Sequence, residues 1–168
     1  AEGLKYDRPR ERPEYLDEVA TLDLSSVEDC KDVGSTLSSL LATPNLASKS
    51  WITEQYDHMV RHGTVVRPGQ ASAGVVRVFR PGQDKNTEPA KGVAIAAGCN
   101  SRLVYLDPFE GSRLSVARAY AELVSVGATP LATTDCLNFG NPEKPDIMWQ
   151  FAESVRGLGD ACASLNTP

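Results

Sequence analysis

A polar loop between an apolar segment and a long helical segment limits the folds that are open to this chain. Residues 135–145 read Asp-Cys-Leu-Asn-Phe-Gly-Asn-Pro-Glu-Lys-Pro. Residues 129–134 are apolar or β-branched, which predicts a buried strand, and residues 146–165 carry apolar side chains at helical spacing. In open α/β sheets, ligands bind beyond the carboxyl ends of strands. The loop is therefore a candidate ligand site, although an ordinary connection capped by asparagine and proline has the same composition.

The length and composition predict one globular domain behind an N-terminal arm. The chain has 168 residues, of which 41% are apolar and 23% charged, so it is long enough to bury a core. Prolines and alternating charges fill its first residues, which is typical of a linker. We expect a linker or extended arm over residues 1–30 and the domain over residues 31–168.

Charge and apolar runs exclude several classes of partner. The net charge of −5 argues against nucleic acid. No run of about 18 apolar residues is present, and the N-terminus lacks the apolar centre of a signal peptide, so we expect no membrane partner. The 4 cysteines are widely spaced without a CxxC pair, which favours reduced thiols over disulfides. These features together predict a cytoplasmic protein.

The periodicity of apolar residues predicts a domain with both helices and strands. Helical patterns cover residues 29–42, a short stretch from 47 or 48, 113–126 and 146–165, and strand patterns cover 64–67, 74–80, 92–97 and 129–134. A brief apolar run at 103–106 reads like the strands. The two long helices are expected to bury apolar stripes made of Leu114, Ala117, Ala121 and Val124 in one, and Met148, Phe151, Val155, Leu158, Cys162 and Leu165 in the other.

Two histidines precede the first strand pattern. His58 and His62 are four positions apart, which would suit two metal ligands on one helix face. Spacing places no third ligand, and Arg61 adds positive charge, so an anion-binding role for the imidazoles and Arg61 fits better. A solvated basic helix end before Gly63 is the alternative.

Several motifs that mark a phosphate site or a nucleophile are missing from the sequence. It contains neither GxxxxGK[ST] nor a GxGxxG turn after a strand, and it has no serine nucleophile elbow. The residues by themselves therefore support an α/β or α+β domain with one candidate ligand loop and no complete catalytic constellation.

A resemblance to a known family rests on four segments. They are WITEQYDHMVRHGT (residues 51–64), VVRPG (65–69), CNSRLVYLDP (99–108) and DCLNFGNPEKP (135–145). Together they resemble phosphoribosylformylglycinamidine synthase, a purine-biosynthesis family, over about residues 40–168. The chain looks like the N-terminal domain of the second aminoimidazole-ribotide-synthetase-like half, cut from a longer polypeptide. The resemblance implies an α+β fold with a mixed four-stranded sheet and helices on one face, which pairs with a second copy into a barrel.

The resemblance also implies an activity. The family converts formylglycinamide ribonucleotide, ATP and glutamine into formylglycinamidine ribonucleotide, so the cofactors would be ATP and Mg²⁺ in the full enzyme. Partners would be the remaining synthase domains, a glutaminase subunit or domain and, for the fragment, a second copy in a homodimer. By resemblance Asp135 contacts ATP, and the loop and the histidine segment would supply the lining residues Asn138, Gly140, Asn141, Lys144, His58 and Arg61. The catalytic histidine and most metal ligands would lie outside this chain, which we expect to be inactive alone.

Several positions depart from the family pattern, and three of them resemble the metal ligands of an auxiliary metal–nucleotide site. Ser72 and Arg118 stand where relatives carry acids, and Glu122 stands where they carry asparagine. Gly98, outside that set, also stands where relatives carry an aspartate. An arginine cannot bind Mg²⁺, which needs oxygen ligands, and an Arg118–Glu122 ion pair could fill the space. We therefore expect this auxiliary site to be lost. Two interpretations follow: the domain contributes part of an ATP and substrate site, or it is a non-catalytic scaffold with a degenerate nucleotide site.

Overall fold

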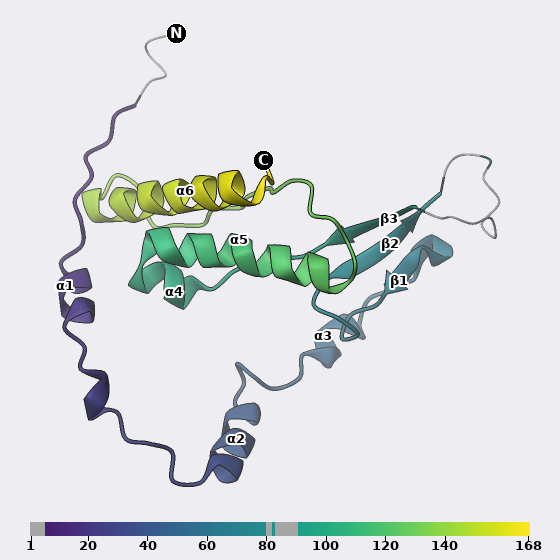
Figure 1. Cartoon of the computed structure of the whole chain (residues 1–168), viewed down its shortest axis with the longest axis horizontal. Coiled ribbons are helices and arrows are strands. Elements are labelled where there is room, and N and C mark those ends of the chain that lie inside the picture. The colour runs from purple at the N-terminus through teal and green to yellow at the C-terminus, as the bar shows by residue number, and fades with distance from the viewer. Residues whose placement is uncertain (1–5, 80–81, 83–90) are drawn as a thin grey trace.

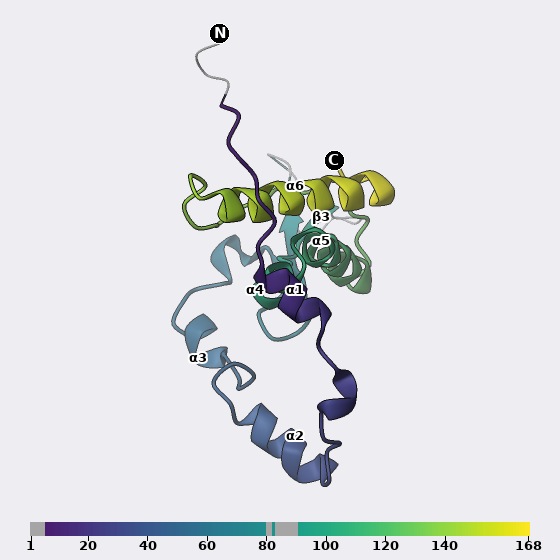
Figure 2. The same cartoon turned by 90° about the vertical axis from the view of Figure 1, so that its left-hand side faces the viewer.

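Two long helices that pack against each other form the centre of the fold. The computed structural model describes residues 6–79, 82 and 91–168. Helices α5 (Pro108–Ser125) and α6 (Pro145–Leu165) lie side by side, and the short helix α4 (Ser101–Leu106) packs on α5 (Figure 1). A small sheet lies beyond the C-terminal part of α5, and the N-terminal segment runs past the beginning of α6 (Figures 1 and 2).

The ends of both long helices follow from their sequence. The Asp107 side chain accepts a hydrogen bond from the Glu110 N–H at 3.0 Å, and Pro108 occupies the first turn, so α5 begins five residues before the predicted position 113. Just beyond its end, Gly127 adopts a φ of 79°. Helix α6 begins at Pro145 and ends before Asn166, whose φ is 54°, and this confirms the helix predicted over residues 146–165.

Small residues, rather than the predicted apolar stripes, form the contact between α5 and α6. Ser154, Gly157 and Ala161 are buried on α6, and a Cβ on Gly157 would lie 2.2 Å from the Phe109 carbonyl oxygen. The predicted α5 stripe is exposed, with Leu114 at 52%, whereas the predicted α6 stripe is half-buried except for Val155, at 45%. The predicted core face of α5 was therefore wrong, and the closest helix contact uses small residues because backbones this close leave no room for larger side chains.

The sheet has fewer strands than predicted. Strands β1 (Thr64–Val66), β2 (Gly74–Val78) and β3 (Lys91–Ile95) form a three-stranded antiparallel sheet in the order β1-β2-β3. The register pairs Val76 with Val93 and Gly74 with Ile95, so the side chains of Val76, Val93 and Ile95 lie on one face of the sheet. The prediction of strands near 64–67, 74–80 and 92–97 is confirmed, although Arg80 lies outside the described residues.

Two segments with strand-like sequences do not join the described sheet. Residues 103–106 belong to helix α4, because Asn100 caps that helix by accepting a hydrogen bond from the Leu103 N–H at 3.2 Å. Residues 129–134 form no strand; Leu131 is 78% exposed, and the Thr133 N–H donates to the Pro168 carbonyl at 2.8 Å. The mixed four-stranded sheet is therefore corrected to a three-stranded antiparallel one in the part of the chain that the structure describes.

The segment before the sheet consists of short helices and 3₁₀ turns joined by irregular connections. It holds α1 (Tyr15–Ala20), the 3₁₀ turn η2 (Leu24–Ser26), α2 (Val33–Leu41), α3 (Ser50–Thr53) and the 3₁₀ turn η3 (Val60–His62). Helix α2 stands away from the helix pair in both views (Figures 1 and 2). Its leucines are about half exposed, at 54% for Leu37 and 48% for Leu40. Helix formation in this segment matches the predictions for residues 29–42 and from 47 or 48, with shorter bounds.

Candidate functional site

The loop over residues 135–145 is held to α6 by its apolar members. Leu137 and Phe139 are half-buried, and the Phe139 ring meets the Phe151 ring edge-on with 5.4 Å between centroids. A Cβ on Gly140 would lie 3.6 Å from the Ile147 side chain, so the loop backbone passes directly over the first turn of α6. These contacts leave the polar side chains of the loop facing solvent.

The polar members of the loop are organised by local hydrogen bonds. Asn138 Nδ2 donates to the Cys136 carbonyl at 3.2 Å. Asn141 Oδ1 accepts from the Glu143 N–H at 3.0 Å, which shapes a turn of the kind asparagine favours. Asp135 and Lys144 are exposed, and the structure gives neither an ion pair with any described residue. A carboxylate, two amides and an ammonium group are thus exposed along one loop, with Lys144 at the beginning of α6.

The predicted lining residues fall into two separate places. Asp135, Asn138, Gly140, Asn141 and Lys144 all belong to the loop before α6. His58 and Arg61 lie in the turn between α3 and β1, directly before the sheet, whereas the loop runs alongside α6 and ends at its first turn (Figure 1). The five loop residues lie along one connection. Thr133, two residues before Asp135, is bonded to Pro168 at the far end of α6, and Lys144 lies at the beginning of that helix. The structure does not join the histidine segment to them.

The histidine segment is not the helix face that the spacing suggested. Helix α3 ends at Thr53, and both Arg61 and His62 have positive φ angles, 59° and 54°. His58 Nδ1 lies 3.2 Å from the Tyr56 carbonyl oxygen, and the Thr64 hydroxyl donates to the His58 carbonyl. The two-ligand interpretation is wrong for this conformation, because a single helical turn does not carry the two imidazoles.

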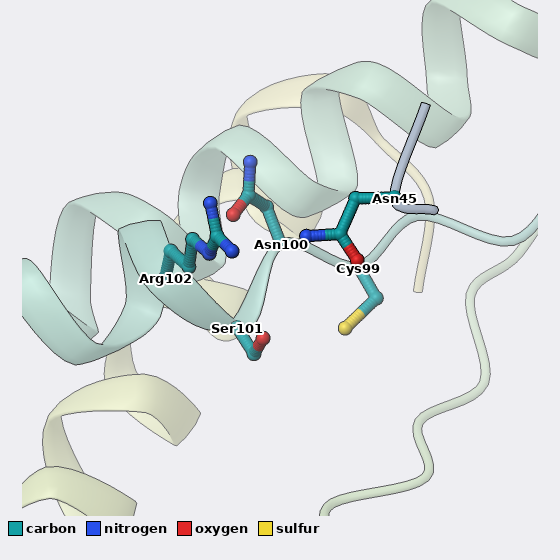
Figure 3. A pocket seen from close by; sticks show the side chains of 5 residues that line it. All are labelled: Asn45, Cys99, Asn100, Ser101 and Arg102. Atoms are coloured by element: carbon teal, nitrogen blue, oxygen red, sulfur yellow. The ribbon is translucent and has the colours of Figure 1, made fainter. Parts of the chain in front are cut away.

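Two open hollows lie around the beginning of α4. One, of about 500 Å³, is lined by Asn45, Cys99, Asn100, Ser101 and Arg102, and Figure 3 shows these five side chains around its mouth. The other, of about 370 Å³, is lined by Ser101, Arg102, Tyr105 and Leu106. Neither includes a residue of the 135–145 loop. Sequence reasoning did not single out Arg102, although it lies inside the 99–108 motif, and no signal pointed to Asn45, which comes from a distant segment.

The ion pair expected between Arg118 and Glu122 is present. Arg118 Nε lies 2.9 Å from Glu122 Oε1, and the two side chains are 64% and 15% exposed. A Cβ on Gly98 would lie 2.2 Å from the Ser115 carbonyl oxygen, so the backbone there leaves no room for an aspartate. Within the described residues, no group of three or more His, Cys, Asp or Glu side chains could hold a metal ion. No helix in the same part of the chain is long and apolar enough to span a bilayer.

A family model and curated proteins match this chain. The model described as AIR synthase related protein, N-terminal domain, matches residues 70–168. The chain is 51% identical over 164 residues to the phosphoribosylformylglycinamidine synthase subunit PurL of Anaeromyxobacter sp. (strain Fw109-5), a match that covers 98% of this chain and 21% of that protein. It is also 51% identical over 163 residues to the corresponding subunit of Moorella thermoacetica, covering 97% and 21%. The chain thus spans about a fifth of the length of these relatives.

Two solved structures are similar in fold. The structure of PurLQS from Thermotoga maritima matches with a TM-score of 0.62 and 30% identity, covering 73% of this chain and 19% of that one. T. maritima PurL complexed with AMPPCP matches with a TM-score of 0.61 and 25% identity, covering 98% and 23%. Both likenesses extend to an α+β domain with a small antiparallel sheet and helices.

Proposed function

The chain belongs to the AIR synthase related family through its N-terminal domain, and on that premise we propose that it is part of a phosphoribosylformylglycinamidine synthase. In this proposal residues 31–168 are the N-terminal domain of the second synthetase-like half, and residues 1–30 are the connecting arm. The whole enzyme would use ATP and glutamine-derived ammonia to convert formylglycinamide ribonucleotide into formylglycinamidine ribonucleotide. The chain would contribute one wall of the site and be inactive alone.

The 51% identity to synthase subunits carries this proposal, because it extends over 98% of the chain. A structural neighbour, T. maritima PurL, is complexed with AMPPCP, an analogue of ATP. This supports a nucleotide as the ligand of the 135–145 loop. The synthase also gives a chemical reason for a site built of positioned polar groups rather than a nucleophile, since phosphoryl transfer depends mostly on positioning and charge stabilisation.

Each polar residue of the loop has a role in the proposed site. Asp135 lies at the beginning of the loop with a free, exposed carboxylate, and it would accept hydrogen bonds from the nucleotide. Lys144 would supply a positive charge to phosphate oxygens, as lysine does in other phosphate sites. Asn138 and Asn141 would donate amide hydrogens, and Gly140 lies against Ile147 in the first turn of α6. His58 and Arg61 would line a different part of the surface in the whole enzyme. The bound Mg²⁺ would neutralise phosphate charge, with its ligands outside this chain.

The proposal includes partners and a compartment. The remaining synthase domains and a glutaminase subunit or domain would complete the enzyme in the cytoplasm. The isolated chain would form a homodimer through its sheet, whose Val76, Val93 and Ile95 side chains are 47%, 50% and 70% exposed. Pairing two such faces into a barrel would cover this apolar surface and remove open sheet edges.

A scaffold role without nucleotide binding is the second candidate. The Arg118–Glu122 ion pair favours it, because an arginine occupies a position where relatives carry an acid. In this alternative the domain holds its neighbours in place, and its own auxiliary nucleotide site has degenerated. The loss of that auxiliary site is part of both candidates.

A chimeric enzyme separates the two candidates. Residues 1–168 replace the matching 21% of the Moorella thermoacetica subunit, and ATP-dependent formation of formylglycinamidine ribonucleotide is measured. We expect an active chimera in which Asp135→Asn lowers kcat/KM for ATP by about 10- to 100-fold, the loss expected for a charge-assisted hydrogen bond. Asp29→Asn, at an exposed position of the arm, is the matched control and should change little.

The other outcomes each decide a point. An active chimera that is indifferent to Asp135→Asn would support the scaffold role. A chimera that unfolds cooperatively on heating but forms no product would contradict membership of the synthase.

A further inference from the structure

Part of the N-terminal arm is built into the helical body. Leu16 is only 6% exposed and Pro13, three residues earlier, is also buried. A free linker would leave both side chains in water. Residues 8–16, which we call the docking segment, therefore belong to the packed part of the molecule, even though their many charged residues and prolines are typical of a linker.

The docking segment reaches the candidate loop directly. The Glu11 N–H donates to the Pro145 carbonyl at 3.1 Å, at the junction between the loop and α6. Arg8 Nη1 lies 3.9 Å from Glu143 Oε1, with the Arg8 side chain 26% exposed. The other backbone bonds at this end of the loop are local, from Lys144 N to Asn141 O and from Met148 N to Lys144 O. Among the described residues, the Glu11 bond is the backbone contact that joins the loop to a segment outside α6.

Tyr15 fixes the other end of the docking segment. Its ring stacks on Tyr105 with 4.3 Å between centroids and 2° between planes, and its hydroxyl donates to the Tyr105 carbonyl at 2.5 Å. Gln150 Nε2 donates to the Tyr15 hydroxyl at 3.3 Å. Tyr15 thus joins α4 to the second turn of α6 at one point. Burial, with Tyr105 and Asp146 nearby, raises the pKa of the Tyr15 phenol, so it remains a hydrogen-bond donor at neutral pH.

We propose that the docking segment holds the end of the 135–145 loop, at Glu143 and Pro145, in the conformation that presents Lys144, with Tyr15 as the positioning residue. The nucleotide as the ligand of that loop rests on the proposed function above; the mechanical link between Tyr15 and the loop does not. Tyr15 and Leu16 anchor the segment, and the Glu11 N–H and the Arg8 guanidinium, four and seven residues earlier, restrain the loop. Without this second attachment, the end of the loop would be held by its own turn and by the packing of Leu137, Phe139 and Gly140 on α6.

Hydrogen–deuterium exchange of the 168-residue chain tests the link. Tyr15→Ala should raise the exchange of amides in residues 136–144 by about fivefold or more, the effect of losing roughly one hydrogen bond's worth of local stability. Exchange in the centre of α5 around Val116 should remain unchanged. Leu24→Ala, a truncation in the same arm at a side chain that is 73% exposed, is the control and should leave both regions unchanged.

A second variant keeps the test decisive if Tyr15→Ala does not fold. Tyr15→Phe keeps the ring stack but removes the hydroxyl that contacts Tyr105 and Gln150, so it should raise exchange in the loop by a smaller factor, about twofold to threefold. Loop exchange that is unchanged in Tyr15→Phe and in any folded Tyr15→Ala would overturn the proposal. So would an increase of equal size in the loop and in α5, because that pattern reports a general loss of stability.

Failure of the docking proposal can be told from failure of the proposed function. AMPPCP is added to the unaltered chain, and protection of the loop is followed by the same exchange measurement. Faster loop exchange in Tyr15→Ala supports the docking segment even if AMPPCP gives no protection, in which case nucleotide binding by this loop is wrong. Protection by AMPPCP together with no effect of either Tyr15 variant overturns the docking segment and leaves the nucleotide site standing.

Discussion

At the scale of single residues, Arg118 and Gly98 show what two departures from the family pattern do locally. Arg118 places its guanidinium 2.9 Å from Glu122, so this carboxylate already has a cationic partner. Gly98 has no space for any side chain, because a Cβ would collide with the Ser115 carbonyl of α5. The ion pair itself adds little stability, a few tenths of a kcal/mol for an exposed pair of this spacing. The consequence of the Arg118–Glu122 pair is instead that this surface does not offer a free carboxylate to a metal ion.

Binding of a magnesium nucleotide tests whether the auxiliary site is lost. In the Asp135→Ala variant, which removes the carboxylate of the candidate loop, we expect isothermal titration with Mg²⁺ and AMPPCP to detect no remaining site. One equivalent of nucleotide still bound by this variant, and then released when Glu122→Ala is added, would show that the auxiliary site is intact. Ser164→Ala, on the exposed end of α6, serves as the unrelated second substitution.

The loop residues could be predicted from sequence, but their supports could not. An acid, two asparagines, a glycine and a lysine after a polar break mark a ligand loop by residue type, and in the structure all five are exposed on the connection that runs alongside α6. The docking segment carries no such mark, since Glu11 acts through its backbone N–H and any residue but proline has one. Asn45 approaches Arg102 through the path of the chain, which residue types do not specify.

At the scale of elements, the contact between α5 and α6 depends on residues without bulk. Gly157→Ala would bring a methyl group to 2.2 Å from the Phe109 backbone, which cannot yield as a flexible side chain would. We expect the free energy of unfolding to fall by about 1–3 kcal/mol, as for other overpacked contacts. Denaturant unfolding followed by circular dichroism measures the difference.

Gly159 in the same helix provides the matched control. No atom lies within 4 Å of a Cβ built on Gly159. Gly159→Ala should therefore raise the free energy of unfolding by up to about 1 kcal/mol, through helix propensity alone. Equal effects of the two substitutions, in either direction, would contradict the close approach of the helices.

The type of an element could be predicted where its stabilising partners are local in sequence. The prediction of residues 129–134 failed because the partner of a strand is distant in sequence. Helices α5 and α6 begin with prolines in their own sequence, so their presence could be predicted, and the bounds of α6 were close, whereas the beginning of α5 was missed by five residues. The segment 129–134 has the composition of a strand, but a strand also needs a neighbouring backbone, and periodicity says nothing of one. The same limit explains the buried contact between α5 and α6. Apolar periodicity marks large residues, whereas the close approach of the two helices requires small ones, here Ser154, Gly157 and Ala161.

At the scale of the whole molecule, the chain exposes far more surface than its mass requires. Its accessible surface is 13100 Å², whereas a compact monomer of 18.1 kDa exposes about 8100 Å². The excess includes the sheet face with Val93 and Ile95, the outer side of α5 and the leucines of α2. This amount of uncovered apolar surface is typical of a chain that is stable in association with a partner.

Light scattering at several concentrations tests association through the sheet. We expect a homodimer at micromolar concentration, unaffected by magnesium-ATP, and conversion to monomer by Val93→Asp, which would place a charge in the centre of the apolar face. Leu22→Asp, on the arm at a side chain that is 66% exposed, should leave the dimer intact. A wild-type chain that is monomeric at every concentration, or a Val93→Asp dimer, would rule out pairing through this face.

The seam between α5 and α6 also sets which sequence changes the protein can accumulate. At Gly157 every possible replacement adds atoms against the backbone of Phe109, and Ser154 and Ala161 have little more room. At exposed positions such as Leu114 and Val155, by contrast, the residue that fits depends on the surface that packs against it. Over generations the three seam positions should therefore stay confined to the smallest residues, while Leu114 and Val155 drift in step with a neighbouring surface. A catalogue of tolerated substitutions would separate the part of this chain that stabilises itself from the part that is shaped by its neighbours.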